Sequence, residues 1–157
     1  MQLQVGQPAP DFTLYDSDKN KVTLSQLRGN QVLLLFFPAA FTSVCTAELC
    51  SVRDNLKKYE QVNAKVLGIS VDSVFTLAWY KEEQKLNFPL LSDFNKNVSK
   101  AYGTLYETFV LDMQGVAKRS AFLIDEEGIL RFAQVLENAG EQPDFHAIQE
   151  ALEVVER

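Results

Sequence analysis

The chain has 157 residues, of which 46% are hydrophobic and 23% charged, with a formal net charge of −6 at pH 7. This length and balance predict one soluble globular domain that spans residues 1–157. The acidic balance argues against a nucleic-acid partner, because phosphate binding needs a basic face. The apolar runs are too short to span a bilayer, so we expect no membrane partner.

The cysteine count and the first residues bear on location and chemistry. Met1 to Gln4 lack the basic region and apolar run of a signal peptide, so we expect a cytoplasmic protein. The two cysteines then indicate redox, catalytic or buried thiols rather than a disulfide framework. A Cys/His zinc site would lack ligands, because His146 is the single histidine. We expect neither a metal nor a cofactor.

Apolar runs and turn residues give a series of predicted elements. In chain order these are a hairpin over Phe12–Tyr15 and Lys21–Leu24, a helical turn over Ser25–Arg28, a strand over Gln31–Phe37, a helix over Thr46–Tyr59, a strand over Lys65–Val71, a helix over Val74–Lys85 capped at Asp72–Ser73, an extended piece over Phe88–Ser92, a helical turn over Asn97–Tyr102, paired strands over Ser120–Ile124 and Leu130–Val135, and a helix over Asp144–Val155. The strand–helix–strand unit predicts a parallel pair. The order is that of a thioredoxin-like α/β fold, with a central mixed sheet flanked by helices and an N-terminal hairpin.

Cys45 stands out because of its place after the central strand. Pro38 ends that strand, and Thr42 or Ser43 is suited to cap the helix that follows. A helix N-terminus presents free N–H groups and positive dipole, which favour a thiolate, the nucleophilic form of cysteine. On residue type alone a buried apolar role would be commoner. The context favours a reactive Cys45.

The segment Pro38–Cys45, PAAFTSVC, fits the P-x-x-x-(T/S)-x-x-C signature of peroxiredoxins, and the chain resembles that family. Further similarity lies in VGQPAPDF from Val5, NFPLLSD from Asn87 and RSAFLID from Arg119, so the likeness covers nearly the whole chain. It implies the same thioredoxin-like fold and a thiol-dependent peroxidase. Such an enzyme reduces hydrogen peroxide or an alkyl hydroperoxide, and its cysteine becomes a sulfenic acid.

The resemblance also implies roles for individual residues. Cys45 would be the nucleophile, and Thr42 would hydrogen-bond the peroxide as well as cap the helix. Arg119, directly before the predicted strand at Ser120, would supply the permanent positive charge. Pro38 would shield the sulfur from water. Glu48, one helical turn after Cys45, either holds Arg119 in place or is simply a favourable carboxylate in the first helical turn.

Two roles are open for Cys50, that of a resolving cysteine and that of a residue in the helix core. On a continuous helix it would lie about 140° and ~7.5 Å along from Cys45, so a disulfide between them requires the helix start to unwind. The PrxQ or bacterioferritin-comigratory type of peroxiredoxin has its resolving cysteine at this spacing. The sequence around Cys45 and Arg119 looks closer to the AhpE-like one-cysteine type, in which an external thiol is the reductant: thioredoxin, glutaredoxin or a low-molecular-weight thiol. Cys50 is then a residue of the helix core.

Two further questions stay open from the sequence. A redox sensor or an interaction module on the same fold, without peroxidase activity, is the alternative function. AhpE-like relatives pair through turns beside the active site, which here contain Phe41, Val44, Phe75 and Trp79. We therefore expect a homodimer, with the two helical aromatics in the core or at the interface.

Overall fold

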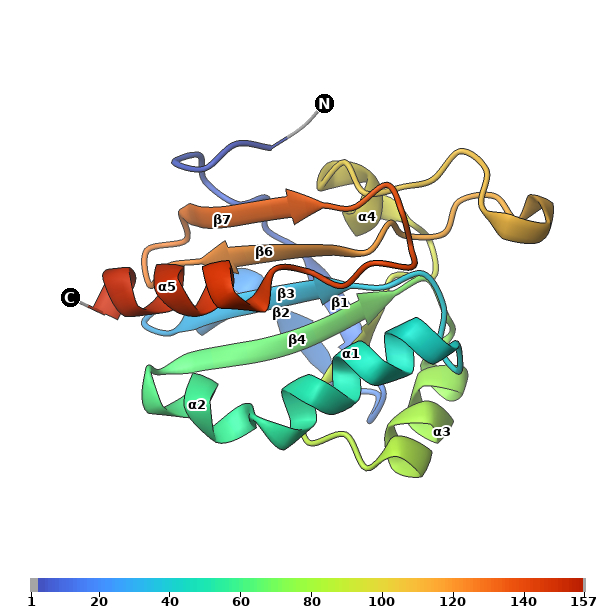
Figure 1. The fold of residues 1–157 in the computed structure, drawn as a ribbon, viewed down its shortest axis with the longest axis horizontal. Helices are drawn as coiled ribbons and strands as arrows, with labels where there is room; N and C mark the ends of the chain where they lie inside the picture. The colour runs from blue at the N-terminus through green and yellow to red at the C-terminus, as the bar shows by residue number, and fades with distance from the viewer. Residues whose placement is uncertain (1–2, 157) are drawn as a thin grey trace.

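The computed structural model describes residues 3–156. Within them a seven-stranded sheet has the order β2-β1-β5-β4-β3-β6-β7 (Figure 1). The strands are β1 (Thr13–Asp16), β2 (Lys21–Thr23), β3 (Gln31–Phe36), β4 (Ala64–Ser70), β5 (Leu90–Ser92), β6 (Ser120–Ile124) and β7 (Leu130–Val135). The helices are α1 (Ser43–Asp54), α2 (Leu56–Gln61), α3 (Val74–Gln84), α4 (Asn97–Ala101) and α5 (Phe145–Glu156), with 3-10 turns η1 (Leu24–Leu27) and η2 (Val110–Asp112).

The sheet is mixed, as predicted. β3 runs parallel to β4, and β4 runs parallel to β5, which confirms the expected parallel pair on either side of the first helices. β6 and β7 continue the sheet from β3 in antiparallel order. The β1–β2 hairpin joins the other side through antiparallel pairing of β1 with β5. The thioredoxin-like α/β architecture is confirmed.

The central strand β3 is buried on both faces and separates two apolar cores. Leu33 and Leu35 point into the first core, which α1, α2, α3 and α5 cover. Leu34 and Phe36 point into the second core, which contains side chains of η1 and α4. This explains why the strand reads as a continuous apolar run rather than an alternating one. Figure 1 shows α1 and α5 together on the face toward the viewer.

Gly68 lies where the parallel strands β4 and β5 leave no room for a side chain on β4. Gly68 pairs with Leu90, and a Cβ atom added at Gly68 would lie 2.7 Å from Cδ2 of Leu90. A side chain at this position would overlap the one that already fills the space. Glycine in this strand is therefore a packing requirement.

The segment before β1 lies along the start of β7. The N–H of Gly6 donates to the carbonyl oxygen of Leu130, and the N–H of Leu130 donates to that of Gln7. Pro8 forms an isolated antiparallel bridge with Ile129. Residues near the N-terminus are thereby attached to the outermost strand on that side of the sheet.

The long helix expected over Thr46–Tyr59 is wrong in its continuity. It begins earlier, at Ser43, and is divided into α1 and α2 at Asn55, whose backbone has φ −114° and ψ 16°. The Asn55 side-chain amide donates to the carbonyl oxygen of Ser51 at 2.8 Å. Asparagine competes in this way with the backbone ladder, which accounts for the break.

Candidate active site

The end of β3 and the start of β6 meet at one edge of the sheet. β3 and β6 are antiparallel, and Phe36 at the end of β3 pairs with Ser120 at the start of β6. Arg119 therefore lies beside the turn that follows β3, and this turn leads into α1. The register brings together Cys45 and Arg119, which are 74 residues apart in the sequence.

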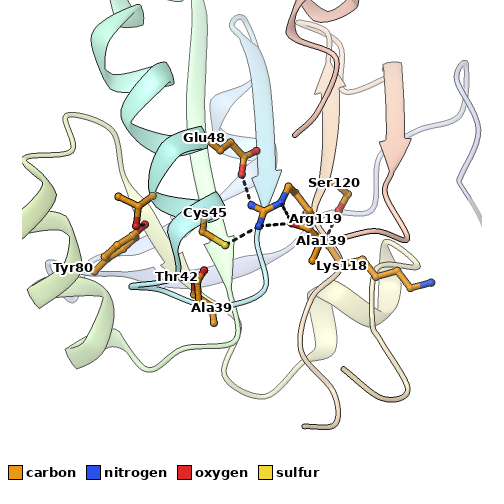
Figure 2. Close-up of polar contacts among 10 residues, drawn as sticks. Ala39, Thr42, Cys45, Glu48, Tyr80, Lys118, Arg119, Ser120 and Ala139 are labelled. Carbon is orange, nitrogen blue, oxygen red and sulfur yellow. Dashed lines mark hydrogen bonds and ion pairs between the residues drawn. The ribbon is translucent and has the colours of Figure 1, made fainter. Parts of the chain in front are cut away.

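The Arg119 guanidinium joins the cysteine to a buried carboxylate (Figure 2). Its Nη2 donates to Sγ of Cys45 at 3.1 Å, and its Nη1 donates to Oε1 of Glu48 at 2.8 Å. Cys45 and Glu48 have no exposed surface, and Arg119 is 2% exposed. Because Glu48 follows Cys45 by one turn of α1, both side chains face the same guanidinium.

The loop between β7 and α5 holds the guanidinium from its other side. Nε and Nη2 of Arg119 both donate to the carbonyl oxygen of Ala139, at 3.2 and 3.1 Å. Together with the two contacts on α1, this carbonyl fixes the plane of the guanidinium. Sequence reasoning missed Ala139 because a backbone carbonyl has no residue signature.

Burial and charge act in opposite directions on the two ionisable partners. Burial raises the pKa of Glu48 to about 7, although the charge of Arg119 and its hydrogen bond act to lower it. For Arg119, burial acts to lower the pKa, but the negative charges of Cys45 and Glu48 outweigh this and raise it. The guanidinium therefore keeps its proton and stays a permanent cation in a buried site.

The turn between β3 and α1 is compact and locally strained. Pro38 is buried at the end of β3, whereas Thr42 is exposed at the start of α1. Thr42 is the N-cap residue of α1, as expected from the sequence. Its hydroxyl, however, donates to the carbonyl oxygen of Ala39 at 2.8 Å. The expected side-chain hydrogen bond to a free N–H of α1 is therefore not made within the described residues. Phe41, directly before Thr42, has φ 68°, a left-handed backbone conformation that costs a residue with a large side chain about 1–2 kcal/mol.

Cys50 lies on the same helix but outside this group of contacts. It is half-buried, and its Sγ lies 3.7 Å from Oε1 of Gln84 on α3. Cys45 and Cys50 are both free thiols, and α1 is continuous between them. The structure thus places Arg119 in contact with both Cys45 and Glu48, with Thr42 near Cys45 (Figure 2) and Cys50 packed toward α3.

The turn between β3 and α1 is supported by two residues, Tyr80 and Asp72, that the sequence analysis did not assign to the site. Tyr80 of α3 contacts the Phe41 ring, with centroids 4.9 Å apart, and its hydroxyl lies 2.9 Å from Oγ1 of Thr46. Asp72, which follows β4, accepts a hydrogen bond from the N–H of Ala40 at 2.9 Å. Asp72 does not cap α3, since Ser73 accepts from the N–H of Thr76. Its place at the carboxyl end of a parallel strand was the available signal.

The exposure of the two aromatic residues of α3 excludes the core as their location, which the sequence had left open. Phe75 is 73% and Trp79 is 65% exposed, so neither belongs to the core of this chain. Phe41, in the active-site turn, is 46% exposed.

Comparison with known proteins decides the family. The model of the AhpC/TSA family matches residues 5–133. The chain belongs to the AhpC/TSA family. Peroxiredoxins are its named relatives: the chain is 42% identical over 153 residues to alkyl hydroperoxide reductase E of Mycobacterium tuberculosis, covering 96% of each chain. A putative peroxiredoxin of Synechocystis is 42% identical, with 85% of this chain and 69% of that protein covered.

The wider AhpC/TSA family includes longer proteins. The 2-Cys peroxiredoxin BAS1 of Spinacia oleracea is 40% identical, but the chain spans only 52% of its length. Among solved structures, the peroxidoxin BcpB of Mycobacterium tuberculosis aligns with a TM-score of 0.85 at 31% identity, over 98% of this chain and 99% of that one. The protein is a peroxiredoxin, a thiol-dependent peroxidase.

Proposed function

We propose that Cys45 is the nucleophile of this peroxidase and that Arg119 activates it. The contact that carries the proposal is the 3.1 Å hydrogen bond from Nη2 of Arg119 to Sγ of Cys45, in a fully buried site at the start of α1. A fixed cation and the helix N-terminus both favour the thiolate there. Glu48 and the Ala139 carbonyl are positioning groups, because they hold the guanidinium in place.

The reaction follows from this arrangement. The Cys45 thiolate attacks the terminal oxygen of HO–OR, the S–O bond forms as the O–O bond breaks, and RO⁻ leaves and takes a proton to become ROH. The protein keeps a sulfenic acid. Arg119 is placed to stabilise negative charge on the sulfur and on the departing oxygen. The Thr42 hydroxyl directs its proton to Ala39, so its oxygen is free to accept a hydrogen bond from the peroxide O–H.

We propose hydrogen peroxide and alkyl hydroperoxides as substrates. The sulfur has no exposed surface, while Thr42 at the start of the same helix is exposed, so a small peroxide would reach Cys45 past Thr42 and beside the buried Pro38. The name of the mycobacterial relative, alkyl hydroperoxide reductase E, supports the organic substrate.

The test measures the rate of the first oxidation step under single-turnover conditions. Cys45→Ser should abolish it while the far-ultraviolet circular dichroism spectrum is unchanged. Arg119→Ala should slow it by about 100- to 1,000-fold, the usual loss when one fixed donor is removed. Arg53→Ala is the matched arginine control, because Arg53 pairs with the exposed Asp54 on the same helix. Full activity of Cys45→Ser would refute the assignment.

We propose that an external thiol reduces the sulfenic acid: thioredoxin, glutaredoxin or a low-molecular-weight thiol. The support is that α1 is continuous between the two cysteines and that Cys50 packs toward Gln84 on α3. Intact mass after one equivalent of hydrogen peroxide separates the two routes. If wild type gains one oxygen, as Cys50→Ser does, the reductant is external. If wild type instead loses two hydrogens, Cys50 resolves Cys45 and α1 unwinds.

We propose that two copies of the chain pair through the exposed aromatic side chains Phe41, Phe75 and Trp79. Phe41 lies in the active-site turn, and large exposed apolar side chains are characteristic of interfaces. Light scattering should give the mass of a dimer for wild type and of a monomer for Trp79→Glu. A monomeric wild type at micromolar concentration would contradict the pairing.

We propose a cytoplasmic location and a role in cell redox homeostasis. Both cysteines are free thiols, which suits a reducing compartment. Within the described residues, none of the helices has the length and apolar character needed to cross a membrane.

A further inference from the structure

The Ala39–Ala40 peptide group lies at the centre of the active-site turn and is held at both ends. Its carbonyl oxygen, that of Ala39, accepts the hydroxyl proton of Thr42 at 2.8 Å. Its N–H, that of Ala40, donates to Oδ2 of Asp72 at 2.9 Å. One rigid plane therefore connects the Asp72 carboxylate to the Thr42 hydroxyl.

Asp72 is itself fixed from two neighbouring strands. Oδ2 also accepts the hydroxyl proton of Ser70, at the end of β4, at 2.7 Å. The carbonyl oxygen of Asp72 accepts the hydroxyl proton of Ser92, at the end of β5, at 2.6 Å. Since β3, β4 and β5 are parallel, all these groups arrive at the same edge of the sheet.

The turn needs such a support, because its backbone is not relaxed. Phe41 adopts φ 68°, which large side chains rarely occupy unless the surroundings impose it. The Phe41 ring contacts Tyr80, but this contact holds the side chain and not the backbone that precedes it. The Ala39–Ala40 peptide, one residue before Phe41, is held by its hydrogen bonds with Asp72 and Thr42.

We propose that Asp72 is a positioning residue for peroxide binding, acting through the Ala39–Ala40 peptide on the Thr42 hydroxyl. A carboxylate that accepts from the N–H of a peptide also polarises its carbonyl, which strengthens the bond from Thr42. With its proton held by Ala39, Thr42 presents lone pairs to the peroxide O–H. Asp72 thereby decides whether Thr42 accepts from the substrate or turns its proton toward it.

This inference rests on the proposed role of Thr42 at Cys45, and the experiment separates the two. We would measure the second-order rate constant for hydrogen peroxide in wild type, Thr42→Val, Asp72→Ala and the double variant. Alkylation of Cys45 by iodoacetamide is measured in parallel, because that reaction uses the thiolate without needing Thr42.

Asp72→Ala should slow the peroxide reaction by about tenfold, as expected for one hydrogen bond to a charged group. Iodoacetamide alkylation should remain at the wild-type rate. In the Thr42→Val background Asp72→Ala should cause no further loss, because the residue through which it acts is gone. Asp72→Asn keeps an acceptor oxygen and should restore most of the rate.

The controls address folding. Asp16→Ala removes an aspartate that also accepts backbone N–H bonds, from Asp18 and Asn20, but in the β1–β2 turn. It should lower stability and leave the peroxide rate unchanged. If Asp72→Ala does not fold, Ser70→Ala is the substitute, because it removes the hydrogen bond from the Ser70 hydroxyl to Oδ2 of Asp72. It should slow the peroxide reaction by less than Asp72→Ala and leave alkylation unchanged.

Several results would overturn the inference. Losses from Asp72→Ala and Thr42→Val that multiply, or a parallel fall in alkylation, would make Asp72 a general structural residue. A wild-type rate for Asp72→Ala beside a slow Thr42→Val would do the same, while leaving the proposed function intact. A wild-type rate for Thr42→Val would remove the role of Thr42 and the inference with it.

Discussion

At the scale of single residues, Glu48 has the most unusual environment. It is fully buried, its Oε1 binds Arg119, and its Oε2 has no hydrogen-bond partner among the described residues. A carboxylate with an unpaired oxygen in such a place is costly when charged, which is why burial raises its pKa to about 7. The charge state of Glu48 should therefore change close to neutral pH.

This environment gives a prediction for stability against pH. The pKa of Glu48 rises from 4.5 to about 7 on folding, so the folded protein binds the proton more tightly than the unfolded chain does. The stabilisation is complete below the unfolded value and is lost as pH rises through the folded one. We expect the melting temperature to fall from about pH 5 to about pH 8 by more in wild type than in Glu48→Gln.

Thermal unfolding across that pH range checks this expectation. Glu60→Gln is the control, because Glu60 is exposed on α2 and its removal should leave the slope of wild type in place. The same pH slope in wild type and Glu48→Gln would show that Glu48 ionises at an ordinary pH in the folded protein.

How much of the site the sequence could predict also depends on individual residues. Cys45, Thr42 and Glu48 are close in the sequence, so helical spacing places them near one another. Arg119 could be assigned to the site only through the resemblance to a family, because the pairing of β3 with β6 that brings it there is a long-range contact. Ala139 contributes a carbonyl and Asp72 contacts a backbone N–H, and neither contact is encoded in a residue pattern.

At the scale of elements, the β4–β5 pair depends on the absence of a side chain. Gly68→Ala would place a methyl group 2.7 Å from Cδ2 of Leu90, which is itself fully buried. Overpacking of this kind costs about 1–3 kcal/mol. We expect urea unfolding to show a loss of that size.

A second substitution can test whether the overlap is the cause. Leu90→Val shortens the side chain that the new methyl group meets, so Gly68→Ala should be less damaging in a Leu90→Val background than in wild type. Equal losses in both backgrounds would place the strain elsewhere in the strand.

The elements themselves were largely predictable from the sequence, for a physical reason. β3, β4 and β6 are largely buried strands, and their apolar runs are bounded by turn residues. The main error arises where a side chain competes with the backbone: Asn55 bonds Ser51 at the end of α1. The cap of α3 expected at Asp72–Ser73 is confirmed at Ser73, while the Asp72 side chain bonds the N–H of Ala40. Local patterns do not say which of two available partners a polar side chain will take.

At the scale of the whole molecule, the two apolar cores share one sheet. Successive side chains of β3 enter opposite cores, Leu33 and Leu35 on one face and Leu34 and Phe36 on the other. Neither core can lose β3 without exposing the other, so we propose that the chain unfolds as a single domain in one transition.

Coincident transitions by far- and near-ultraviolet circular dichroism, with equal calorimetric and van't Hoff enthalpies, are the expected result. A resolved early transition, with secondary structure lost before aromatic packing or the reverse, would show two units that unfold separately.

The residues that lie along β7 have a consequence for the behaviour of the protein in concentrated solution. An uncovered outer strand offers unpaired N–H and C=O groups to a neighbouring molecule. Gly6 and Gln7 form hydrogen bonds with the C=O and N–H groups of Leu130. Pro8 has no N–H and so cannot donate a backbone hydrogen bond to a strand of another molecule. Cleavage after Ala9 should therefore leave the catalytic site in place and yet produce a protein that self-associates edge to edge and precipitates.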